Sequence, residues 1–182
     1  MFALACSLFV PFFQEPGQLP ESWFGLWKGT IRIDGVARPS QSVDMSLEVT
    51  AIPKSSRVNW ILMYVAQGKT DVRKYELALV PDQPGRFLMD ERNGIVLDHS
   101  LVGNTLSSLF QVQNTLLHVS FQLEKDTMRV TMSSYDAQAV RESGATTQET
   151  KVSSYPLKSV QQGTLRRIRS KGKTSLDVVH CG

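Results

Sequence analysis

The dominant pattern along the chain is an alternation of apolar and polar residues at every second position. It is clearest over residues 43–51, where each second residue is apolar and the residues between are polar. Successive side chains of a β-strand point to opposite faces, so this pattern predicts strands with one buried face. Residues 27–33 show the same period, with one face made of Trp27, Gly29, Ile31 and Ile33.

Turn signals separate these segments at short intervals and predict nine strands before residue 136. Asn93-Gly94, for example, is a preferred pair for a tight hairpin because both residues tolerate positive φ. Connections of a few residues can join only antiparallel neighbours, since a parallel return needs a crossover of a dozen or more. Residues 155–169 supply the final strand. The one predicted helix covers residues 136–144, with Asp136 as its cap and Gly144 at its end.

This succession of strands predicts an all-β fold. An open sheet of this length would expose two edges and a broad apolar face, and closure into a barrel removes both. We therefore predict an up-and-down antiparallel β-barrel of eight to ten strands with at most one short helix. The alternative is a two-sheet sandwich, whose long crossing connection only residues 136–156 could provide.

The start of the first strand carries a short motif. Residues 20–22 predict one helical turn, and Gly25-Leu26-Trp27 follows at the head of the strand. Gly-x-Trp in this position resembles the opening motif of the lipocalin and wider calycin families of ligand-holding barrels, over about a dozen residues. The resemblance implies that Gly25 and Trp27 close one end of a barrel. It also implies that Arg166 or Arg167, from the last strand, lies across the Trp27 ring.

Two adjacent strands carry the candidate ligand-binding residues, which are Trp60, Tyr64, Arg73 and Tyr75. Alternation places them on faces shared with leucines, and a few polar groups among apolar walls are typical of small-molecule pockets. The same mixture also fits a solid barrel core in which these groups satisfy one another. An unpaired buried charge is too costly to keep. Arg73 therefore either serves an acidic head group in a wet interior or pairs with a carboxylate.

Residues 58–65 are apolar on both faces, which predicts cover on both sides, from the N-terminal segment or from a partner. This strand supports the alternative function, an exported structural or interaction protein with a solid-packed barrel.

The sequence offers little for catalysis. In Asp98-His99-Ser100, alternation places the histidine on the face opposite its neighbours, so the three cannot form a local relay. The chain has three histidines without a His-x-His pair, and it has no phosphate loop or nucleophile elbow. We expect no cofactor, no metal and no enzymatic activity.

Composition limits the partners. A hydrophobic content of 41% and a charged content of 20% are typical of one globular domain. The net charge is +3, but five basic residues lie within 166–173, and without them the remainder carries −2. We therefore expect no nucleic-acid binding, although the tail could be attracted weakly to anionic surfaces. Oligomeric state is left open. Cys6 and Cys181, at opposite ends, do not form a disulfide framework.

The ends of the chain differ from its centre. Eleven of the first thirteen residues are apolar, which favours an export signal over a buried N-terminal strand. We predict a leader over residues 1–20, one barrel domain over 21–169 and a mobile basic tail over 170–182. With such a leader we expect the protein to be exported, and a cytoplasmic location is the alternative. The resemblance implies a non-enzymatic, lipocalin-like binding protein for an apolar or amphipathic small molecule.

Overall fold

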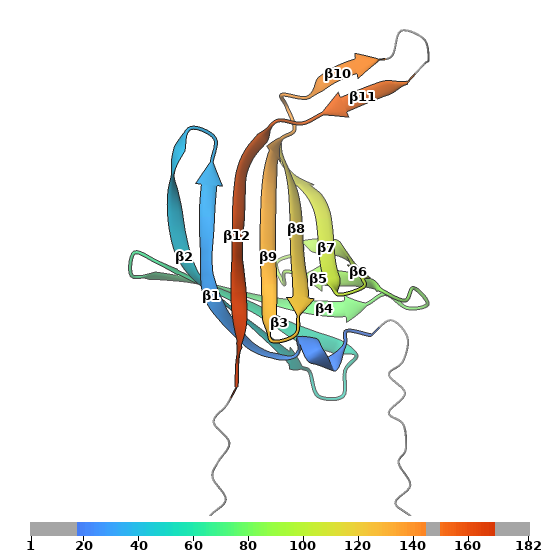
Figure 1. The fold of residues 1–182 in the computed structure, drawn as a ribbon. Helices are drawn as coiled ribbons and strands as arrows, with labels where there is room; N and C mark the ends of the chain where they lie inside the picture. Colours follow the sequence, from blue (N-terminus) through green and yellow to red (C-terminus); the bar gives the residue numbers. More distant parts are fainter. Residues whose placement is uncertain (1–17, 145–149, 170–182) are drawn as a thin grey trace, which may run out of the picture.

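The computed structural model describes residues 18–144 and 150–169, and its main feature is a closed barrel of ten antiparallel strands (Figure 1). The barrel order is β1-β12-β9-β8-β7-β6-β5-β4-β3-β2. Its strands are β1 (Gly25–Gly35), β2 (Arg38–Ala51), β3 (Arg57–Ala66), β4 (Lys69–Leu79), β5 (Arg86–Asp90), β6 (Val96–Val102), β7 (Thr105–Val112), β8 (Thr115–Glu124), β9 (Thr127–Asp136) and β12 (Leu157–Ile168). Two further strands, β10 (Arg141–Gly144) and β11 (Lys151–Ser154), form a separate hairpin.

The topology confirms the predicted all-β, up-and-down barrel and excludes the sandwich. Strands β1 to β9 follow one another around the barrel, and β12 closes it by pairing with both β9 and β1. The β10–β11 hairpin lies between β9 and β12 in sequence and projects beyond one end of the barrel (Figure 1). Among the described residues, no helix is long and apolar enough to cross a membrane.

The predicted helix over residues 136–144 was wrong. The Asp136 carboxylate instead accepts hydrogen bonds from the backbone N–H groups of Gln138 and Ala139, at 2.9 and 3.2 Å. Residues of β10 then pair with β11. A helix of about two turns is marginal in water, and the local side-chain bond offers the backbone an alternative. The helical turn expected before the first strand is a 3₁₀ turn, η1 (Glu21–Trp23).

Two glycines allow β1 and β12 to approach closely. A Cβ atom at Gly29 would lie 2.3 Å from the Thr164 carbonyl oxygen, and one at Gly163 would lie 2.3 Å from the Thr30 carbonyl oxygen. Both distances are far inside van der Waals contact with backbone atoms. Closure of the barrel along this seam therefore requires glycine at both positions.

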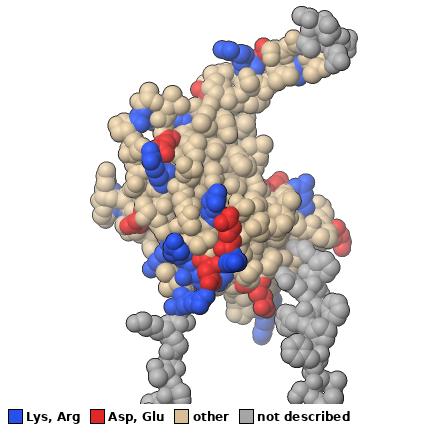
Figure 2. All heavy atoms as spheres, in the orientation of Figure 1, with Lys and Arg blue, Asp and Glu red and all other residues tan. Residues whose placement is uncertain are grey.

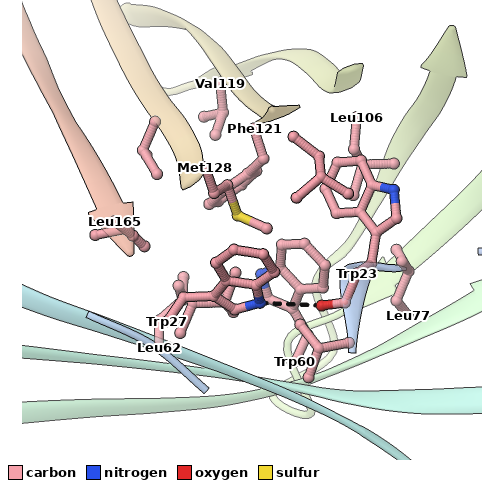
Figure 3. Packing of buried hydrophobic residues seen from close by; sticks show 14 of the residues in the cluster. Trp23, Trp27, Trp60, Leu62, Leu77, Leu106, Val119, Phe121, Met128 and Leu165 are labelled. Atoms are coloured by element: carbon pink, nitrogen blue, oxygen red, sulfur yellow. Dashed lines mark hydrogen bonds between the residues drawn. The ribbon is translucent and has the colours of Figure 1, made fainter. Parts of the chain in front are cut away.

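The core fills the end of the barrel at which β1 begins, and we call this the closed end. Trp23, Trp27 and Trp60 are buried there together (Figure 3). The Trp27 indole donates a hydrogen bond to the Trp23 carbonyl at 3.0 Å. The Trp60 ring meets Phe121 edge to face, with centroids 5.0 Å apart. The three indoles and their aliphatic neighbours seal this end.

Charged side chains are unevenly placed on the outside. In Figure 2 they gather toward the closed end, over the β1–β2 hairpin and on the β10–β11 hairpin, while the wall over the upper parts of β12, β9 and β8 is largely free of charge. Near the closed end, Asp126 in the β8–β9 turn pairs with Arg167 and Arg169. This turn is thereby tied to the end of β12.

The predicted leader and tail fall largely outside the described residues, which omit 1–17 and 170–182. The division into leader, domain and tail, and export with it, therefore stay predictions.

Candidate ligand chamber

The closed end is fixed by contact between the first and last strands. Trp27 and Arg167 are directly opposite in the register of β1 and β12, and the guanidinium carbon lies 4.1 Å from the Trp27 ring centroid. The guanidinium also donates to the carbonyl groups of Ser22 and Phe24. Arg167 thus joins the indole to the 3₁₀ turn that covers it. A cation over an indole is attracted by the ring quadrupole.

The other two residues of the predicted closing motif have different positions. Arg166 is exposed on β12, opposite Lys28 in register, so it does not cross the Trp27 ring. Gly25 has φ of +123°, and a Cβ atom there would lie 3.1 Å from an Arg167 guanidinium nitrogen. Glycine at position 25 therefore leaves room for the guanidinium and adopts a backbone conformation that other residues rarely take.

Beyond the tryptophans lies a small inner cavity of about 80 Å³. All four candidate ligand-binding residues line it, together with Leu62, Met89, Glu91, Leu97, His99, Phe110, Val119, Phe121, Val130 and Met132. The structure therefore brings these four together on one interior surface. A cavity of this size has room for a few water molecules or for one end of a larger molecule.

Two larger spaces continue from the inner cavity toward the other end of the barrel, which we call the open end. The middle space, of about 210 Å³, shares Tyr64, Arg73 and Met132 with the inner cavity. The outer basin, of about 520 Å³, shares Ile33 with the middle space. Because neighbouring spaces share lining residues, the three follow one another from Trp60 to the open end: the inner cavity, the middle space and the outer basin.

Arg73 lies at the boundary between the inner cavity and the middle space. It forms an ion pair of 3.0 Å with Asp71, and its guanidinium carbon lies 5.2 Å from the Tyr64 ring centroid. Its side chain is 48% exposed. Of the two alternatives for Arg73, the structure shows pairing with a carboxylate, but in a partly open interior rather than in a solid core.

The titratable groups here have shifted pKa values with identifiable causes. Burial raises the pKa of both Tyr64 and Tyr75, so both phenols are protonated donors at neutral pH. Burial opposes the charge on Arg73, but the hydrogen bond to Asp71 and nearby partners raise its pKa overall. The inner cavity therefore offers a charged guanidinium and two neutral hydroxyl groups.

His99 is a chamber residue that the sequence analysis missed. It is only 5% exposed, lines the inner cavity, and has Nδ1 3.3 Å from the Leu97 carbonyl oxygen. Burial lowers its pKa, which favours the neutral imidazole at neutral pH. The signal was present, since alternation places His99 on the same face as Leu97 and Leu101. Glu91 also lines the inner cavity, but it lies in the β5–β6 connection, where no strand alternation predicts which way a side chain faces.

The strand with two apolar faces, β3, has one face inside the barrel and one outside. Trp60 and Leu62 are buried inside, whereas Met63 and Val65 are half-buried and line a groove of the outer wall with Lys28 and others. The described residues form a single-layered barrel, so no second strand or helix from them covers this outer face.

No sequence family matches the chain, and no curated protein matches it. Several solved structures share its fold, and three of them illustrate the similarity. The S-type phycobiliprotein lyase CPES from Guillardia theta is 10% identical with a TM-score of 0.60, over 83% of this chain and 91% of that one. A protein of unknown function from the DUF3598 family of Nostoc punctiforme is 14% identical with a TM-score of 0.59, over 84% of this chain and 50% of that one. Rv2717c from M. tuberculosis is 14% identical with a TM-score of 0.52, over 82% and 94%.

These similarities show the fold alone, a closed ten-stranded antiparallel barrel, and the expected lipocalin-like fold is consistent with it. They also correct the expectation that the chain is not an enzyme, because one barrel of this fold is named a lyase. The all-β barrel and the lack of a known catalytic motif therefore do not separate a binding protein from an enzyme.

Proposed function

We propose that this chain binds one amphipathic small molecule inside its barrel, along the three spaces between Trp60 and the open end. The observation that carries the proposal is their arrangement in series, with shared lining residues at each boundary. The inner cavity alone is far below the 300 to 1,000 Å³ that is typical of ligand pockets, whereas the three together fall in that range. An extended molecule fits this arrangement better than a compact one.

The chemistry of the walls favours a particular orientation. The deep part is lined mainly by apolar and aromatic side chains such as Phe110, Phe121 and Val130. Its polar groups are Tyr75, Glu91 and His99, and Tyr64 and Arg73 at the boundary with the middle space. The closed end is sealed by buried indoles. The ligand therefore enters from the open end with its apolar part first.

The ligand class rests on wall chemistry and on fold similarity together. The apolar depth supports fatty-acid-like amphipaths. The fold shared with a barrel named a phycobiliprotein lyase makes linear tetrapyrroles a second class to test. Product analysis after incubation with the ligand separates simple binding from chemical conversion.

The test is a pair of tryptophan substitutions on neighbouring residues of β9. Met132 lines both the inner and middle spaces, so Met132→Trp should fill the path and weaken binding by about tenfold or more. Thr131, the adjacent residue, belongs to the outer wall by alternation, and Thr131→Trp is the matched control. A fluorescent fatty acid and biliverdin, a linear tetrapyrrole, serve as probes.

The proposal predicts that at least one probe binds the parent protein and the Thr131→Trp variant, but binds Met132→Trp poorly. Cooperative thermal unfolding of both variants shows that they remain folded. The proposal is wrong if no probe binds the parent, or if Met132→Trp binds as the parent does.

A further inference from the structure

The outer basin brings together two basic side chains that are far apart in sequence. Arg38, at the start of β2, and Lys158, near the start of β12, both line it. The Val36 N–H donates to the Lys158 carbonyl at 3.0 Å, which ties the tip of the β1–β2 hairpin to β12. Closure of β1 on β12 therefore places both cations at one opening.

Neither cation is neutralised within the described part of the chain. No carboxylate among residues 18–144 and 150–169 forms an ion pair with Arg38 or Lys158, and the Lys158 ammonium donates only to the Thr115 hydroxyl, at 3.4 Å. By contrast, Arg32 on the same hairpin pairs with Asp34 at 2.9 Å. The basin cations are thus available to a ligand.

The basin contains one carboxylate, Asp136, whose charge is already engaged. One of its oxygens accepts two backbone N–H groups, from Gln138 and Ala139. Two cations against one hydrogen-bonded carboxylate leave the side chains that line the basin with a net charge of +1. The remaining lining is neutral or apolar, as an amphipathic molecule requires: Ile33, Gly35, Val36, Pro39, Gln41, Ser134, Pro156, Leu157 and Ser159.

The deeper spaces have the opposite charge balance. Arg73 is held by Asp71, and Glu91 also lines the inner cavity, so one guanidinium faces two carboxylates. An anionic group placed there would have to compete with Asp71 and lie near Glu91. Like charges at close range cost free energy, and the half-exposed positions of Arg73 and Asp71 screen this repulsion only in part.

From these observations we propose that the outer basin is a subsite for the carboxylate of the bound ligand, which lies between Arg38 and Lys158 while the apolar body extends past Ile33 toward Trp60. The inference rests on the proposed function and goes beyond it, because it assigns the ligand class, an amphipathic carboxylic acid, and its direction in the barrel.

The experiment compares a fluorescent long-chain fatty acid with its own methyl ester, since the two differ only in the anionic group. The parent protein should bind the acid about tenfold more tightly than the ester, and this preference should decrease with added salt. In the double substitution Arg38→Gln with Lys158→Gln, the affinity for the acid should fall to the level of the ester, which abolishes the preference. Arg32→Gln, which removes a paired cation on the outer wall of the same hairpin, should retain the preference.

The outcomes separate this inference from the function on which it rests. Equal affinity of the parent for acid and ester overturns the subsite but leaves ligand binding intact. A preference that persists in the double variant, or that disappears in Arg73→Gln instead, also overturns the subsite, and the latter result assigns the carboxylate to Arg73. If neither probe binds, the proposed function fails as well.

Discussion

Replacing Arg167 by methionine tests how the barrel is closed. The side chain is 21% exposed, and it makes a cation–π contact with Trp27 and donates to the carbonyl groups of Ser22 and Phe24. Methionine keeps much of the packing volume but removes the charge and every donor. The 3₁₀ turn would then lose its link to β12.

The magnitude follows from these contacts. The cation–π contact is worth about 0.5 to 2 kcal/mol, and a hydrogen bond from a charged group contributes about 1.5 to 3 kcal/mol. Partial exposure and water replacement reduce the sum, so we expect a loss of about 2 to 4 kcal/mol in the free energy of unfolding. Trp27→Ala, which empties a buried indole site, should cost about 3 to 5 kcal/mol. Arg166→Met, at an exposed position, should cost less than about 0.5 kcal/mol.

Urea unfolding of the single variants gives these losses in the free energy of unfolding. The double variants, which combine Trp27→Ala with Arg167→Met or with Arg166→Met, give the coupling energy of each pair. The Trp27–Arg167 coupling should be about 0.5 to 2 kcal/mol, and no coupling is expected between Trp27 and Arg166. The reasoning is refuted if Arg167→Met unfolds at the same urea concentration as Arg166→Met, or if the Trp27 and Arg167 effects simply add.

Three further predictions concern single positions. Gly29→Ala should cost more than about 2 kcal/mol in thermal unfolding, because its Cβ would clash with the β12 backbone. Gly103→Ala, at φ of +61° with open space around it, should cost only about 1 kcal/mol, and equal losses would contradict this account of the seam. The buried indole N–H of Trp60 has no hydrogen-bond partner among the residues that the structure describes, so Trp60→Phe should destabilise less in urea than Trp27→Phe; the reverse order would show that the N–H has an acceptor. Because burial lowers the pKa of His99 below its ordinary 6.5, the unfolded chain binds the proton more readily, and stability should fall as pH drops below about 6.5. His99→Gln should reduce this slope, by at most about 1.4 kcal/mol per pH unit, and parallel pH profiles for parent and variant would contradict the prediction.

The strands could be predicted because each turn is short and each strand has one buried face. Residues 43–51, for example, alternate without interruption and lie within β2 as expected. The number of strands then follows from the turns. The helix predicted over residues 136–144 was wrong because this short polar segment has little periodicity. Its conformation depends instead on the side-chain hydrogen bonds of Asp136.

The site could be predicted only where alternation alone decides which way a residue faces. Tyr64 and Arg73 were placed on interior faces in this way, and both line the chamber. The choice between Arg166 and Arg167 depends on the register between β1 and β12, which no local pattern specifies. The position of Arg38 and Lys158 on one basin likewise depends on closure of the barrel, which brings β1 and β12 together.

Native mass spectrometry of the protein purified under non-denaturing conditions tests the central claim most directly. If the barrel holds one amphipathic small molecule, the native spectrum should show a complex heavier than the polypeptide by the mass of a single small molecule. An added fatty acid or biliverdin should displace that molecule or fill an empty barrel in a 1:1 ratio, and Met132→Trp should prevent both. A parent spectrum that contains only the bare polypeptide, and does not change on addition of either probe, would contradict the account.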